Sequence, residues 1–135
     1  MAKDQNGPVF QLTAGATFAK ADLYKFVAVN SSGHAVTSGP TTASGNIAGT
    51  LWSVTNTTSG AGSEPVSVRD LTGKFPVRMA ASTRAAGQTI AASSVGFGIA
   101  PSTDQAALAI AVEGTSGAVG RIHTAVGIAA SAADV

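Results

Sequence analysis

Short apolar runs separated by small polar residues recur along the whole chain. Residues 23–36, LYKFVAVNSSGHAV, predict two strands around the polar turn NSSG, in which Gly33 accepts a positive φ at little cost. Residues 46–56, NIAGTLWSVTN, predict a further strand, because apolar and β-branched residues dominate them. This part of the chain therefore favours a succession of strands.

Residues 65–79, PVSVRDLTGKFPVRM, predict a strand, a turn at DLTG and a second strand. Val66 and Val68 alternate with polar residues, which places both valines on one face of the first strand and Arg69 on the other. Pro76 has no N–H to donate, so it restricts the second strand to a sheet edge or a bulge.

The remainder of the chain continues this pattern. QTIA, VGFGIA, ALAIAVE and GRIHTAVGI are short strand candidates, and no segment has a convincing amphipathic helical pattern. Turn signals recur every ~8–12 residues, which is typical of an all-β barrel or sandwich. We therefore predict a small all-β barrel or sandwich.

A repeated tetrapeptide suggests that this fold contains two related units. TSGA occurs within TTSGAG (57–62) and again within GTSGAV (114–119), 57 residues later, and EPVSVR then corresponds roughly to RIHTAV. With an offset of 72, residues 14–36 also align with residues 86–108 without a gap. We interpret TSGA as a hairpin turn in a duplicated β unit. Chance matching in a chain rich in Ala, Gly and Ser is the alternative.

These patterns predict one domain with two short extensions. Residues 1–13 form an N-terminal arm, residues 14–128 the β domain, and residues 129–135 a C-terminal tail. The two related units of the internal duplication cover about 14–79 and 86–128.

Composition narrows the possible functions. Hydrophobic residues make up 44% of the chain but aromatic residues only 5%, so the core is built largely from small side chains. Charged residues make up 11%, the net charge is +1 and the basic residues are scattered, which argues against a nucleic-acid partner. No apolar run approaches the ~20 residues of a membrane span, and the N-terminus has no secretory pattern. We expect synthesis in the host cytoplasm and no membrane partner.

The residues that usually carry chemistry are dispersed. The chain has no cysteine, which excludes disulfides and thiolate metal sites. His34 and His123 lie far apart, and neither belongs to a metal-binding pair of histidines. No serine lies in GxSxG, and Glu64 and Glu113 do not stand out from the other acids as a catalytic pair.

No glycine-rich segment has the setting of a phosphate-binding loop either. GAG at 60–62 is followed by a predicted strand, and GFG at 96–98 lies inside one. We therefore expect no enzyme, no cofactor and no metal.

Two apolar features suggest contacts instead. Trp52 is expected to fill a core or an interface, although a lone tryptophan can also stack on a sugar ring. Val9, Phe10 and Leu12 follow a polar start and a Gly-Pro break. They form either the lead into the first strand or an extended arm that contacts a neighbouring subunit by strand addition.

The chain resembles the small head-decoration, or cement, proteins of tailed bacteriophages. The similarity spans about 14–128 and rests on AGATFAKADLYKFVAV, SSGHAV, NIAGTLWSV, TTSGAG and PVSVRDLTGKFPV, with a looser second pass from AGQTIAASSVGFGIA. The second pass departs from the pattern, because it lacks a strand as clear as NIAGTL and has Gly98 where the first has Phe26.

This resemblance implies a non-enzymatic virion protein on the outer surface of a phage head. Its partners would be the major capsid protein and other copies of itself, with a trimer favoured over a dimer. Bridging neighbouring capsid subunits would stabilise the head through several weak contacts. A carbohydrate-binding module on a virion surface, with Trp52 and Tyr24 as stacking platforms, and a tail or fibre-base structural protein are the alternatives.

Overall fold

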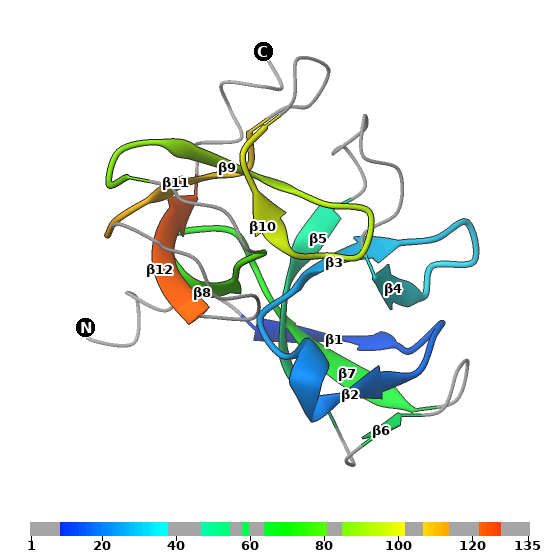
Figure 1. Ribbon diagram of the computed structural model, residues 1–135. Coiled ribbons are helices and arrows are strands. Elements are labelled where there is room, and N and C mark those ends of the chain that lie inside the picture. The colour runs from blue at the N-terminus through cyan, green and yellow to red at the C-terminus, as the bar shows by residue number, and fades with distance from the viewer. Residues whose placement is uncertain are drawn as a thin grey trace.

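A computed structural model describes residues 9–37, 47–54, 58–59 (backbone only), 64–80, 85–101, 107–113 and 122–127. These residues form an all-β fold with two five-stranded antiparallel sheets and a short two-stranded pair (Figure 1). The predicted fold class, a small two-unit β barrel or sandwich, is therefore confirmed. Within the described residues, helical structure is confined to one 3-10 turn, η2 (Lys20–Asp22).

The first sheet has the strand order β1-β7-β5-β3-β4 and the second β10-β9-β11-β12-β8. The strands of the first are β1 (Val9–Thr13), β3 (Phe26–Val29), β4 (Ala35–Thr37), β5 (Ile47–Val54) and β7 (Pro65–Arg69). Those of the second are β8 (Lys74–Arg78), β9 (Thr89–Ala92), β10 (Gly98–Ile99), β11 (Ala109–Ala111) and β12 (Ile122–Gly127). The short pair is β2 (Phe18–Ala19) with β6 (Thr58–Ser59).

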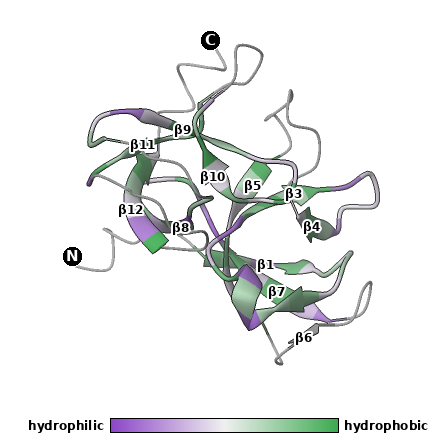
Figure 2. Cartoon of the chain, in the orientation of Figure 1, coloured by the Kyte–Doolittle hydropathy of each residue, from purple (hydrophilic) through white to green (hydrophobic). Residues whose placement is uncertain are grey.

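These strands confirm the sequence predictions. Residues 23–36 contain the hairpin of β3 and β4, and 46–56 contain β5. Residues 65–79 contain β7 and β8, and β8 is an edge strand, as Pro76 requires. Hydrophobic residues follow the strands of both sheets (Figure 2). The TSGA segments lie outside the described residues except for the backbone of β6, so their predicted role as turns stays a prediction.

The two five-stranded sheets are connected in the same way. Each places its first strand at one edge, beside its last strand, and its third strand at the other edge. A parallel bridge joins the two edges, between Ala14 and Ala35 in the first sheet and between Met79 and Gly98 in the second. Each sheet therefore curls around its own core, and we call residues 9–69 and 74–127 the first and second units.

The hairpins of the two units share their turn chemistry. The N–H groups of Asn30 and Ser93, 63 residues apart, each donate to the carbonyl four residues on, at 2.9 and 2.8 Å. The side-chain oxygen of each accepts the N–H groups two and four residues on. Gly33 and Gly96, again 63 apart, have φ values of 82° and 92°, which glycine adopts without strain.

The strand register repeats as well. The first strand of each unit pairs with the last at five positions, starting from Val9 opposite Arg69 and from Lys74 opposite Val126. Equivalent positions are thus 65 residues apart in the first strands (9 to 74) and 57 in the last (69 to 126). The fourth strands are 60 apart (49 to 109), since Gly49 and Ala109 take the equivalent cross-strand places. The two units are equivalent strand by strand.

This equivalence corrects the alignment inferred from sequence. The offset of 57 is confirmed for the last strands, but the offset of 72 is wrong for residues 14–36, because it aligns β3 with β10 whereas the register aligns β3 with β9. Alanine and glycine matches occur in several registers of this chain, and they favoured the wrong one. The structural units also include β1, which the sequence had assigned to the arm 1–13.

Each unit has its own apolar core. Phe18 of β2 completes the core of the first unit, whereas Phe26 of β3 leaves its own unit and completes the core of the second. The first core contains Ala14, Phe18, Val27, Ala35, Leu51, Val66 and Val68. The second contains Phe26, Phe75, Val77, Met79, Ile90, Ala92, Ala109, Ala111 and Ala125. The two units therefore fold as one body joined through Phe26.

Equivalent core positions exchange large and small side chains. Ala14 and Ala35 of the first unit correspond to Met79 and Gly98 of the second. A Cβ on Gly98 would lie 2.7 Å from the sulfur of Met79, so the glycine makes room for the longer side chain.

Candidate functional site

The side chains considered for chemistry do not converge. His34 lies in the β3–β4 turn and His123 in β12, in different units. The Nδ1 atom of His123 lies 3.2 Å from the exposed carboxylate of Glu113, whereas Glu64 precedes β7 in the other unit. Among the described residues, no group of three or more His, Asp or Glu side chains could hold a metal ion.

The two aromatic residues considered for sugar binding do meet. Tyr24 and Trp52 pack edge to face, with ring centroids 6.1 Å apart and an interplanar angle of 77°. Both side chains are half-buried. The pair is a T-shaped contact rather than a flat platform. The sequence missed this contact because 28 positions separate the two residues, as their numbering shows.

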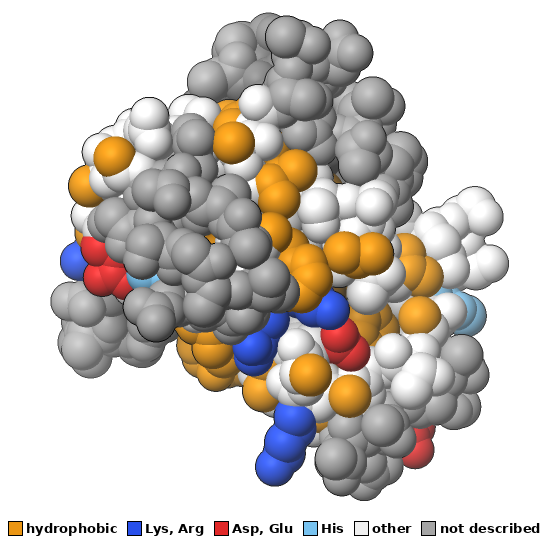
Figure 3. Space-filling model, viewed as in Figure 1, with side chains coloured by type: hydrophobic (Ala, Val, Ile, Leu, Met, Phe, Trp, Pro, Cys, Tyr) orange, Lys and Arg blue, Asp and Glu red, His pale blue; other side chains and the backbone are white. Residues whose placement is uncertain are grey.

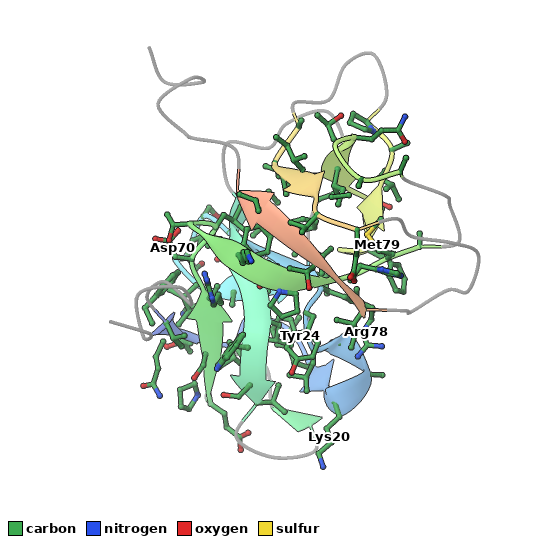
Figure 4. The ribbon with its side chains drawn as sticks, turned by 90° about the vertical axis from the view of Figure 1, so that its left-hand side faces the viewer. Lys20, Tyr24, Asp70, Arg78 and Met79 are labelled. Atoms are coloured by element: carbon green, nitrogen blue, oxygen red, sulfur yellow. The ribbon has the colours of Figure 1, made fainter. Side chains whose placement is uncertain are left out.

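Tyr24 also lies at a polar junction between the units. Its φ is 71°, a conformation that residues other than glycine rarely adopt. Its carbonyl accepts the N–H of Arg78 at 2.9 Å, and the Nε of Arg78 donates to the carbonyl of Leu23 at 2.8 Å. Figure 4 shows Tyr24 and Arg78 next to each other, with Lys20 farther out. These bonds across the junction hold the backbone of Tyr24 in place.

One acidic residue organises the same junction. Asp22 accepts hydrogen bonds from the side chain of Lys25 at 2.8 Å and from the backbone N–H of Ala19 at 2.9 Å. Burial by itself raises the pKa of Asp22, but these bonds and the charges of Lys25 and Arg78 outweigh it, so the pKa lies below its ordinary value. Lys25 in turn lies 4.6 Å from the ring centre of Phe97 in the second unit. The charged cluster has a structural role within the chain.

Arg69 is a buried cation that the sequence did not identify as part of a contact. It is 0% exposed, donates to the backbone carbonyls of Asp70 and Lys74, and lies 5.8 Å from the ring centre of Phe75. Burial lowers its pKa. This side chain covers the first strand of the second unit.

The predicted contact residues Val9, Phe10 and Leu12 lie in β1. This strand pairs with β7 of its own sheet, so residues 9–13 lead into the first unit, and residues 1–8 lie outside the described residues. Leu12 is half-buried against the first core, whereas Val9 and Phe10 are 44% and 36% exposed. Whether they contact another subunit stays a prediction.

Other large apolar side chains are exposed in the second unit. Val95 lies in the β9–β10 turn, and Ile110, Val112 and Ile122 belong to β11 and β12 or follow them directly. Figure 3 shows hydrophobic side chains across the visible face and few charged ones. Exposed apolar clusters of this kind are typical of binding surfaces.

Comparisons with known proteins add no family. No protein-family model matches the chain, and no curated protein matches it. In the part of the chain that the structure describes, no helix is long and apolar enough to cross a membrane.

Proposed function

We propose that this protein is a structural component of a phage virion that binds the outside of the capsid lattice and stabilises the head. The specific proposal of a decoration protein rests on the sequence resemblance over about 14–128. It is a non-enzymatic function, carried by surfaces rather than by a catalytic site. The major capsid protein is the proposed partner, and bridging its neighbouring subunits is the proposed mechanism.

One structural observation supports a binding function of this kind. Large apolar side chains are exposed at three separate places: Val9 and Phe10 on β1, Val95 in a turn, and Ile110, Val112 and Ile122 on the second sheet. A protein that bridges two subunits needs at least two separate attachment surfaces. Weak patches that engage together give a strong attachment, because the second contact forms at a high effective concentration.

Sedimentation tests the proposal. Lysate of the producing cells is separated on a density gradient, and the fractions are probed for this protein and for DNA-filled heads. We expect co-migration with the heads. A variant with Val95→Ser and Ile122→Thr should co-migrate less, whereas Ala85→Ser, a conservative change at another exposed residue, should not. Wild-type protein that stays at the top of the gradient would refute the proposal.

The packing of Tyr24 against Trp52 supports a second candidate, binding of a carbohydrate. An edge-to-face pair at the surface can offer one ring face to a sugar. Trp52 is the single tryptophan, so its fluorescence reports on this place alone. A shift with members of a glycan panel that is lost in Tyr24→Ala would favour this function, and an unchanged spectrum with every glycan would exclude it for that panel.

A further inference from the structure

The contact between the two units buries one row of the first sheet. Phe26, Thr50 and Arg69 are neighbours across β3, β5 and β7, and all three are 0% exposed. Phe26 enters the core of the second unit, and Arg69 covers Phe75. The outer face of one unit thus covers the first strand of the next.

The equivalent row of the second unit is uncovered. Thr89, Ile110 and Val126 are the cross-strand neighbours that correspond to Phe26, Thr50 and Arg69. Ile110 is 36% exposed, against 0% for its equivalent Thr50. In stacked repeats, a terminal face that meets only solvent is polar. This face instead carries the large apolar side chains of an interface.

The opposite end of the stack is uncovered in a matching way. Phe10 corresponds to Phe75, since each is the second residue of its unit's first strand and stands opposite a core residue of the last strand. Phe75 is 2% exposed because Arg69 and the second core surround it. Phe10 remains 36% exposed. Each end of the two-unit stack therefore shows one half of the contact that joins the units internally.

A difference between the units fits a repeat of this contact. The internal contact inserts Phe26 into the second core, but its equivalent in the second unit is the small residue Thr89. The first core needs no inserted ring, because Phe18 of β2 already completes it. The outer face of the second unit therefore has the shape that a filled first unit requires.

We propose that a second copy of this chain binds head to tail, with Phe10 of one copy against Ile110 and Val126 of the other. This contact repeats the internal one between Phe75 and Arg69, and it buries the exposed apolar residues of both ends. Such an interface joins two different surfaces, so successive copies form a ring if the rotation closes and a filament if it does not. The inference does not depend on the proposed function.

Cross-linking tests the pairing directly, because the chain has no cysteine of its own. Copies carrying Phe10→Cys and Ile110→Cys, each with a tag of different size, are mixed and treated with a short bismaleimide. We expect a covalent dimer that contains both tags, and no dimer from either variant alone. Replacing Ile110→Cys by Val95→Cys, a more exposed position in a turn, should abolish the mixed dimer.

Light scattering provides a second test that does not rely on these variants. The wild-type protein should show a mass that is a multiple of 13.2 kDa and falls on dilution. Ile110→Thr and Val95→Ser each introduce the residue at the equivalent position of the first unit, Thr50 and Ser32. Ile110→Thr should reduce the mass towards that of a monomer, and Val95→Ser should leave it unchanged. A monomeric wild type, an equal effect of both variants, or cross-linked dimers of Ile110→Cys with itself would overturn the proposal.

Discussion

Truncation of Phe26 tests the joining of the two units most sharply. Phe26→Ala removes a ring that is 0% exposed and lies in the core of the second unit, although its strand belongs to the first. A buried phenylalanine covers roughly 150–200 Å², which at about 25 cal/mol per Å² corresponds to ~4–5 kcal/mol. This agrees with the ~3–5 kcal/mol usual for such truncations.

A loss of this size is a large part of the total stability, which is about 5–15 kcal/mol for domains in general. We expect the midpoint of thermal unfolding to fall by roughly 10–20 °C at about 3–5 °C per kcal/mol. Urea unfolding followed by far-UV circular dichroism and by Trp52 fluorescence measures the change. Circular dichroism reports on both units, whereas Trp52 lies in β5 of the first unit.

The control is Val95→Ala, at a turn residue that is 51% exposed, for which we expect a change within about 0.5 kcal/mol. If Phe26→Ala cost less than about 1 kcal/mol, the shared core would be refuted. An unchanged Trp52 transition, with only the circular dichroism altered, would show that the units unfold independently and would also contradict the account.

Three further predictions concern close packing and charge. Gly49→Ala should prevent folding, measured by far-UV circular dichroism, because its Cβ would lie 2.0 Å from the backbone oxygen of Arg69; a folded variant would contradict the register. Asp22 has a lowered pKa, so its stabilisation is present above its unfolded pKa of about 3.9 and is lost as the pH falls through its folded pKa. Asp22→Asn should therefore reduce the acid sensitivity of urea unfolding, and an unchanged pH profile would oppose this. Gly98→Ala should destabilise the fold through its 2.7 Å contact with Met79, and Met79→Ala should compensate with a coupling of about 1 kcal/mol in a double-mutant cycle, whereas strict additivity would exclude the size exchange.

Much of the fold was predictable because its signals are local. The alternation of Val66 and Val68, the glycine of the β3–β4 turn and the proline of β8 each predict their element from a few neighbouring residues. The offset of 57 between the last strands was also found from sequence, since the match includes a conserved order of turn and strand.

The alignment of the hairpins was not predictable in the same way. A match of alanines and glycines favoured 72 over 63, and only the strand pairing distinguishes the two. The hydrogen bonds of Asn30 and Ser93 carry the true equivalence, but Asn and Ser share no obvious similarity in an alignment of apolar residues. A shared backbone role therefore left little trace in residue identity.

The contact residues were only partly predictable, because burial there depends on tertiary structure. Arg69 alternates like a surface residue, yet it is completely buried under the second unit. Phe10 and Phe75 occupy equivalent positions with opposite exposure. Nothing in the local sequence of either residue indicates which one the chain covers.

The most direct test of the proposed function is electron cryomicroscopy of heads produced with and without this protein. We predict additional density on the outer surface, over the boundaries between major capsid subunits, in heads that contain the protein, and its loss in heads that lack it. Identical shells in the two preparations, with the protein absent from purified heads, would contradict the account.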